Sequence, residues 1–134
     1  MEKWITFGSG IFMTLVLSAT MIGFGRLFQK NPPQEINSLY GYRTARSMKN
    51  RETWDFAHHY IGRLWWRIGW WMLAVSAVLH LLLLFVSWME AGTILLMFLQ
   101  MIVLILPIFP TEKALKKHFD SFGQRILEQK TDGF

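Results

Sequence analysis

Two apolar runs separated by a single acid decide the fold of this chain. They make up residues 68–111, which read IGWWMLAVSAVLHLLLLFVSWM-E-AGTILLMFLQMIVLILPIFPT. Neither run, residues 68–89 or residues 91–111, contains Asp, Glu, Lys or Arg. Each is as long as the roughly 20 residues that a helix needs to cross the hydrocarbon core of a bilayer. We therefore expect two membrane-spanning helices in an antiparallel hairpin, with a short turn from Glu90 to Gly92.

A third apolar run, residues 4–25, lies near the N-terminus. It is longer than the apolar part of a signal peptide and lacks an Ala-x-Ala cleavage site, so we expect a retained helix. The chain has 134 residues and is 52% hydrophobic, which leaves too little polar sequence to cover three such runs in water. The sequence predicts an all-α integral membrane protein with one membrane domain over residues 1–134. The expected transmembrane helices are about 4–28, 64–89 and 91–110.

Polar and small residues inside these spans carry two structural expectations. His80 and Gln100 lie near the middle of the second and third spans, where polar side chains are costly and usually face other helices. We expect a hydrogen bond between them across the hairpin. Ala19 and Gly23 have the small-xxx-small spacing that lets membrane helices approach closely. They are the expected contact if the chain forms a homo-oligomer or is a subunit of a complex, although a generally glycine-rich helix explains them equally well.

The distribution of basic residues predicts the orientation of the spans. Of the 14 Lys and Arg residues, one precedes the first span, eight lie between the first and second, none lies between the second and third, and five follow the third. Because cytoplasmic segments carry the excess of Lys and Arg, residues 26–67 and 111–134 are expected on the cytoplasmic side and the N-terminus outside. Topology and contact with anionic lipid then explain the net charge of +5, and we expect no direct nucleic-acid binding.

The polar sequence predicts two further helical segments. Asn50 can cap a helix whose positive end then holds Glu52, so the second helix is expected to extend into the cytoplasm from about residue 51. After the third span, residues 111–129 place apolar side chains at helical spacing among charges. This pattern predicts an amphipathic C-terminal helix that lies on the inner leaflet of the membrane. Its apolar positions are Leu115, Phe119, Phe122, Ile126 and Leu127.

Residues able to carry chemistry gather in residues 37–59, which read NSLYGYRTARSMKNRETWDFAHH. Gly41 followed by Tyr42-Arg43-Thr44 indicates a turn that fixes a guanidinium and a hydroxyl in place. Basic and hydroxyl side chains here can bind a phosphate, either of a lipid headgroup or of a soluble ligand. These side chains are Arg43, Thr44, Arg46, Ser47, Lys49 and Arg51. Charge that serves only the membrane topology is the alternative interpretation.

Asp55, His58 and His59 follow at i, i+3 and i+4, so on a helix the carboxylate can reach either imidazole. Such residues can bind a metal ion or act as acid and base. Adjacent histidines, however, point about 100° apart on a helix, and polar residues at the headgroup level are the simpler interpretation. The sequence has no cysteine and no nucleotide-binding, hydrolase or zinc-protease motif, so it requires no cofactor and gives no support for an enzyme.

The same stretch resembles the SdpI-like family of small bacterial membrane proteins, named for immunity to a sporulation-delaying killing peptide. The resemblance is carried by Gly41-Tyr42-Arg43-Thr44, Ser47-Met48-Lys49-Asn50, Trp54, Ala57 and the upstream Asn37. The founding member has more spans, and the family often has an asparagine where this chain has His58. The expected residues for binding a ligand or partner are Asn37, Gly41, Tyr42, Arg43, Thr44, Ser47, Asn50, Trp54 and His58.

The resemblance implies a multi-pass protein of the bacterial inner membrane. It further implies resistance to a membrane-active toxin peptide and the holding of a cognate cytoplasmic repressor at the membrane. In this hypothesis Arg43, Thr44 and Trp54 shape the cytoplasmic site, and the basic loop docks an acidic partner or anionic lipid. The alternative is a small enzyme or lipid-handling protein at the cytoplasmic interface. There Arg43 would hold a phosphate, and the acid and adjacent histidines would supply the chemistry.

Overall fold

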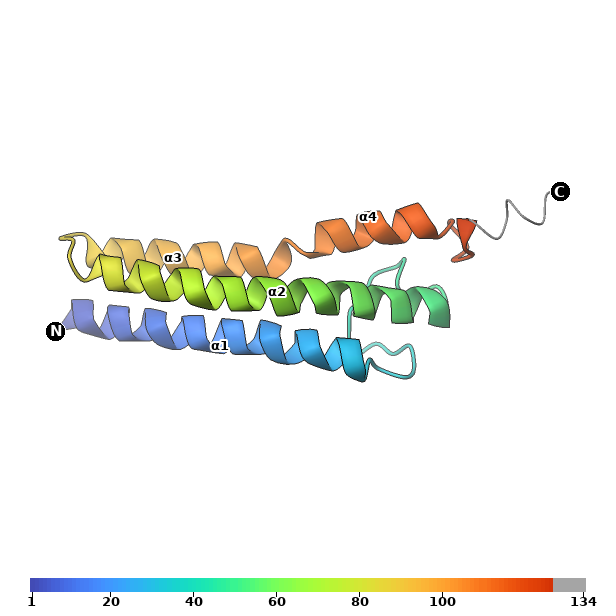
Figure 1. Ribbon diagram of the computed structural model, residues 1–134, viewed down its shortest axis with the longest axis horizontal. Helices are drawn as coiled ribbons and strands as arrows, with labels where there is room; N and C mark the ends of the chain where they lie inside the picture. Colours follow the sequence, from blue (N-terminus) through green and yellow to red (C-terminus); the bar gives the residue numbers. More distant parts are fainter. Residues whose placement is uncertain (127–134) are drawn as a thin grey trace. The chain divides into compact units, whose positions relative to one another are not determined.

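The computed structural model describes residues 1–126, which form four α-helices (Figure 1). In chain order these are α1 (Glu2–Lys30), α2 (Arg51–Leu83), α3 (Met89–Ile105) and α4 (Ile108–His118). Three helical stretches are long and apolar enough to cross a membrane, namely Glu2–Lys30, Arg51–Leu83 and Met89–His118. The predicted all-α class with three candidate membrane spans is confirmed. The start of the second helix at residue 51 is also confirmed.

The described residues form two compact units. The apolar unit consists of residues 1–24 and 65–106, and the basic unit consists of residues 25–64 and 107–126. Both long helices, α1 and α2, contribute to each unit. The single membrane domain over residues 1–134 and the side of the membrane on which each segment lies remain predictions.

In the apolar unit, α1 packs through a stripe of side chains with heptad spacing. Phe7, Thr14, Leu17 and Met21 of this stripe are buried, and their separations of three, four and seven residues put them on one helix face. Met72 of α2 packs against Leu17 and Met21. Most of the exposed side chains of the same helices are also apolar, which suits helices surrounded by lipid rather than by water.

Two glycines allow close approach of helices within the apolar unit. A Cβ added at Gly10 would lie 2.3 Å from Cγ2 of Thr93, and one added at Gly69 would lie 2.9 Å from Cγ1 of Ile22. By contrast, a Cβ added at Gly23 would meet nothing within 4 Å among the described residues. The expected small-residue contact at this position therefore remains a prediction about a partner helix.

The predicted hydrogen bond between His80 and Gln100 is wrong. The Gln100 Nε2 group donates to Thr14 Oγ1 at 2.6 Å and to Ser76 Oγ at 2.9 Å. His80 instead uses Nδ1 to donate to the backbone carbonyl of Ser76 at 2.8 Å. Gln100 meets α2 at Ser76, one helical turn before His80, and it meets α1 at Thr14. One hydroxyl oxygen on each helix accepts a hydrogen bond from its amide group. Such contacts between helices keep polar groups away from lipid.

The turn between α2 and α3 lies earlier than predicted. Helix α2 ends at Leu83 and residues 84–88 form the turn, so Glu90 and Gly92 already belong to α3. Gly92 serves packing, because a Cβ there would lie 2.4 Å from Cδ2 of Leu83 and 2.8 Å from Cζ3 of Trp88. The glycine that suggested a turn is therefore a close-contact residue inside a helix.

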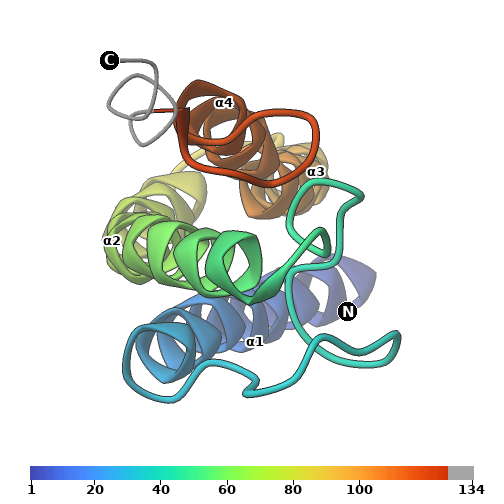
Figure 2. The ribbon, with the colours of Figure 1, turned by 90° about the vertical axis from the view of Figure 1, so that its right-hand side faces the viewer.

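In the basic unit, α4 packs beside the first turns of α2 and the loop of residues 31–50 (Figure 2). The ring of His118 lies 5.2 Å from that of Phe56, measured between centroids. The predicted amphipathic character of α4 is confirmed, since Leu115 is buried while the neighbouring lysines are exposed. Leu115 and Phe119 pack inside the protein. The location of this helix on the inner leaflet stays a prediction.

The C-terminal helix also ends sooner than predicted, at His118. Phe119 is extended and pairs with Arg125 around a tight turn. In this turn Gly123 has a φ of +81°, and Asp120 Oδ1 accepts hydrogen bonds from the N–H groups of Phe122 and Gln124, both at 2.9 Å. Asp at the start of a turn and Gly at its end are a common turn combination that stops a helix. Leu127, the last predicted apolar position, lies outside the described residues.

Candidate functional site

The polar loop is fixed to α2 by a reciprocal cap. The Thr53 N–H donates to Asn50 Oδ1 at 2.9 Å, and the Asn50 N–H donates to Thr53 Oγ1 at 3.1 Å. Each side chain thereby satisfies one of the backbone donors left free at a helix start. Asn50 also reaches the other side of the unit, where its Nδ2 donates to the Gly123 carbonyl at 2.6 Å. Asn50 therefore joins the loop, α2 and the turn after α4.

His58 lies at the centre of the basic unit and is fully buried. Its Nδ1 is 2.7 Å from the carbonyl of Trp54, and its Nε2 is 2.8 Å from the backbone N of Tyr42. A carbonyl only accepts and an N–H only donates, so Nδ1 carries the proton and Nε2 accepts. Both ring nitrogens are thus engaged by the backbone, and His58 holds the loop against α2.

Gly41 and Trp54 complete this contact. Gly41 has a φ of +114°, and a Cβ at this position would lie 2.5 Å from Nε2 of His58. Both facts require glycine, because the backbone conformation is strained for other residues and the added atom would collide with the imidazole. Trp54 is fully buried and donates from Nε1 to the Pro33 carbonyl at 2.8 Å, which ties the loop entrance to α2.

Thr44 and Ser47 close the middle of the loop. The Thr44 N–H donates to Ser47 Oγ at 2.9 Å, and the Ser47 N–H donates to Thr44 Oγ1 at 3.2 Å. The Ser47 hydroxyl lies 2.9 Å from the Tyr42 carbonyl and donates to it. Ser47 is fully buried. Both hydroxyls therefore stabilise the loop, and a phosphate-binding role for Thr44 and Ser47 remains a prediction.

Tyr42 connects the loop to α4. Its hydroxyl donates to Glu112 Oε1 at 2.6 Å, and its side chain is buried. Burial, together with the neighbouring Glu112 carboxylate, holds the pKa of the Tyr42 hydroxyl far above its ordinary value. Tyr42 therefore stays protonated and acts as a hydrogen-bond donor across the unit.

Asn37 and Arg43, the other predicted binding residues, also make local contacts. Asn37 Oδ1 accepts hydrogen bonds from the N–H groups of Leu39 and Tyr40 at 3.0 and 2.7 Å, as in an Asx turn. The exposed Arg43 guanidinium donates to the Ser38 carbonyl. A ligand-binding role for either residue remains a prediction.

The acid and the histidines proposed for metal binding or catalysis do not converge. The Asp55 carboxylate accepts hydrogen bonds from Arg51 Nε at 3.0 and 3.2 Å. His59 donates from Nδ1 to the Asp55 backbone carbonyl at 2.8 Å, and both nitrogens of His58 are already bonded. Among residues 1–126, no three His, Cys, Asp or Glu side chains are close enough to hold a metal ion.

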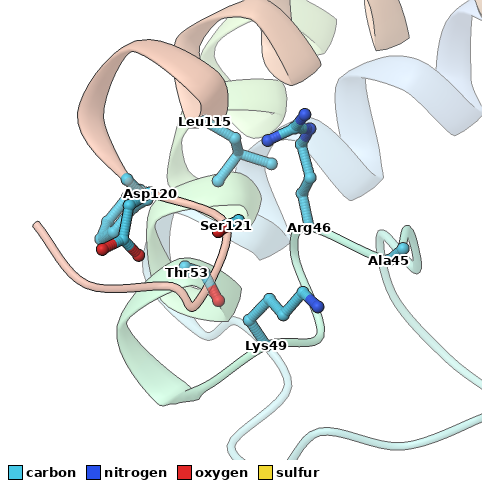
Figure 3. A pocket seen from close by; sticks show the side chains of 8 residues that line it. Ala45, Arg46, Lys49, Thr53, Leu115, Asp120 and Ser121 are labelled. Carbon is cyan, nitrogen blue, oxygen red and sulfur yellow. The ribbon is translucent and has the colours of Figure 1, made fainter.

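A cavity of about 270 Å³ opens where the loop, α2 and the segment after α4 meet (Figure 3). The loop contributes Arg46 and Lys49, α2 contributes Thr53, and α4 contributes Leu115. Of these, only Arg46 and Lys49 were expected to bind a ligand. The spacing of Leu115 and Phe119 showed an apolar face, but not that this face would turn towards the loop.

These features define a class, a multi-pass α-helical membrane protein whose polar loop is folded against its own helices. Residues 34–111 match the sequence profile of the SdpI/YfhL protein family, and the chain belongs to this family. It is similar to the uncharacterized protein YfhL of Bacillus subtilis (strain 168), with 46% identity over 50 residues. This match covers 37% of the chain and 46% of that relative. No solved structure matches the chain.

Proposed function

We propose that this protein is a non-enzymatic immunity or signalling protein of the bacterial inner membrane. It would give resistance to a membrane-active toxin peptide and hold a cytoplasmic repressor at the membrane. Residues 26–67 and 111–134 would face the cytoplasm, where the basic unit docks the acidic partner. Membership of the SdpI/YfhL family supports the class of protein, and the family name is the basis for the immunity role.

One observation favours recognition over catalysis. The motif side chains are engaged within the basic unit: both nitrogens of His58 bind backbone atoms, Ser47 binds Thr44, and Tyr42 binds Glu112 of α4. A general base or nucleophile must instead be within reach of a substrate. We call this arrangement the platform. It consists of the motif residues that hold the loop in place, namely Gly41, Tyr42, Thr44, Ser47, Trp54 and His58. In the proposal, the surface that these residues shape binds the partner.

The catalytic alternative has less support from the contacts. It needs Asp55 to act with a histidine, but the Asp55 carboxylate is paired with Arg51. It also needs Arg43 to hold a phosphate, while this guanidinium is bonded to the loop carbonyl of Ser38. The outer face of the loop, which includes the exposed residues Leu39, Arg43 and Lys49, could contact a partner.

Survival under toxin tests the proposal. A susceptible bacterial strain producing the chain is challenged with a membrane-active killing peptide of the sporulation-delaying type. We expect protection by the unaltered chain, and the same protection by His59→Gln and Asp55→Asn, because neither residue forms part of the platform. Loss of protection in these two variants, with normal amounts of folded protein in the membrane, would favour the catalytic alternative. Absence of protection by the unaltered chain would contradict the immunity role.

Retention of a repressor is a separate measurement. Membranes that contain the chain are isolated from toxin-treated and untreated cells, and the proteins that co-purify with the chain are identified. We expect a DNA-binding protein in the toxin-treated membranes. Gly41→Val disrupts the platform and should abolish its retention. Equal recovery with this variant would show that the platform is not the docking site.

A further inference from the structure

The cavity of the basic unit combines cationic side chains with apolar walls. Arg46 and Lys49 reach it from the loop, Leu115 and Phe119 provide apolar surface, and Ser121 adds a hydroxyl. Figure 3 shows these elements around one space, with the loop on one side and the segment following α4 on the other. Its volume of about 270 Å³ is slightly below the usual range for drug-sized ligands, so the site suits a small group.

The two cations are available to a ligand. Among residues 1–126, the Lys49 ammonium has no hydrogen-bond or salt-bridge partner, and its side chain is exposed. Arg46 Nε and Glu112 Oε2 form a salt bridge at 3.9 Å, a distance that is too long for a hydrogen bond. Glu112 instead accepts from the Tyr42 hydroxyl at 2.6 Å. The guanidinium N–H groups of Arg46 donate no hydrogen bond within residues 1–126, so they can bind an oxyanion.

The acids near the cavity are engaged with other groups. Asp120, which also lines it, accepts two backbone hydrogen bonds of its own turn. Glu52 is paired with Arg125. Two cations and one acid line the space, and the described residues of the basic unit contain eleven Lys and Arg against five Asp and Glu. The local and the surrounding charge therefore both favour an anion.

We propose that this cavity binds a phosphate group, with Arg46 as the bidentate ligand and Lys49 as the second cation. Guanidinium suits a phosphate because its paired N–H groups match two oxygens, while ammonium acts as a point charge. The apolar wall of Leu115 and Phe119 would contact the part of the ligand next to the phosphate. A lipid headgroup and a free phosphate share this chemistry. The proposal does not depend on the immunity role, because binding can be measured without a toxin.

The experiment uses the full chain purified in mild detergent. Native mass spectrometry measures binding of phosphatidic acid and of diacylglycerol with the same acyl chains, which differ only in the phosphate. Calorimetry measures binding of inorganic phosphate. We expect phosphatidic acid to bind and diacylglycerol not to bind. Competition by inorganic phosphate at comparable concentration would identify a free phosphate as a ligand, whereas retention of phosphatidic acid alone would identify a lipid headgroup.

Two charge-matched double variants make the test specific. Arg46→Ala/Lys49→Ala removes the cations of the cavity, and Lys116→Ala/Lys117→Ala removes two exposed cations of α4 that do not line it. We expect the first pair to weaken binding by about tenfold or more, the effect of losing one charge-assisted hydrogen bond. The second pair should weaken it by less than about twofold, because distant exposed charges are screened.

Equal loss in the two pairs, or equal binding of phosphatidic acid and diacylglycerol, would overturn the proposal. Thermal unfolding in the same detergent shows whether each variant is folded. If the alanine pair unfolds, Arg46→Gln/Lys49→Gln replaces it, since glutamine keeps the apolar stem of each side chain and removes only the charge. Unchanged binding by this folded pair would equally overturn the proposal.

Discussion

The apolar unit and the basic unit share the two long helices α1 and α2 but are stabilised in different ways. The apolar unit contains two basic and two acidic residues, whereas the described part of the basic unit contains eleven and five. In the apolar unit two side chains of α3 make hydrogen bonds to other helices: the Gln100 amide donates to Thr14 and Ser76, and the Glu90 carboxylate accepts from Thr6. In the basic unit a series of hydrogen bonds, centred on Tyr42 and His58, holds the loop.

This difference shows what each environment requires. Helices that satisfy their own backbone can pack in lipid through shape, with glycines where they approach closely. A loop has no such internal pattern, so every buried backbone group needs a specific partner. We therefore expect substitutions in the loop to cost more than substitutions of similar size in the apolar unit.

The largest expected effect is that of Gly41→Val. The substitution places a β-branched residue at a φ of +114° and sets a Cβ 2.5 Å from His58 Nε2. Backbone strain and overpacking together should lower the free energy of unfolding by about 4 kcal/mol. Gly23→Ala is the matched control, because its Cβ meets nothing within 4 Å among the described residues, and it should change stability by less than about 1 kcal/mol. Denaturant unfolding in detergent measures both, and similar effects would contradict the contrast.

Tyr42→Phe should have the next largest effect. It removes the hydrogen bond of 2.6 Å to Glu112 and keeps the ring. A hydrogen bond to a charged group contributes about 1.5 kcal/mol, so we expect a loss of this size. Tyr60→Phe serves as the control, since the Tyr60 hydroxyl has no hydrogen-bond partner in the described part of the chain. Hydrogen exchange should show faster opening of the loop in the first variant alone.

Gln100→Leu tests the apolar unit. It removes the hydrogen bonds to Thr14 and Ser76 and fills the space with a side chain of similar volume. Hydrogen bonds between membrane helices contribute little each, so stability should fall by about 1 kcal/mol. Thermal unfolding in detergent measures this change. A loss larger than that of Gly41→Val would mean that the apolar unit depends on specific polar contacts as much as the loop does.

The smallest expected effect is a dependence on pH. Because the pKa of Tyr42 is raised in the folded state, its proton is released from the unfolded chain first as the pH rises above 10. The contribution of Tyr42 to the free energy of unfolding is therefore fully present well below pH 10 and is lost as the pH rises above 10. For one tyrosine with a strongly raised pKa, the loss is about 0.8 kcal/mol at pH 10.5. The difference between the unaltered chain and Tyr42→Phe isolates this effect. An identical decrease in both would assign it to other groups.

Much of the fold could be predicted from the sequence, because it follows from local properties. The length and apolar character of the runs predicted three spanning helices, and Asn50 with the following residues predicted the start of α2. The end of α2 was misplaced, since a glycine pattern does not distinguish a turn from a close helix contact. The partner of Gln100 was also predicted wrongly. The residues that face Gln100 depend on how α1, α2 and α3 pack together, which the sequence pattern does not specify.

The sequence by itself determined the helical class, the membrane character and the stretch that holds the motif, since hydropathy, charge and glycine act over a few neighbouring residues. Only the tertiary structure decided the use of the motif side chains. It placed Gly41 against His58, turned Tyr42 towards Glu112 on α4, and left Arg46 and Lys49 beside a cavity. These pairings join residues far apart in the chain, and the Asp120–Gly123 turn brings the end of α4 back to the loop. No local pattern specifies such contacts, because they depend on the packing of whole helices.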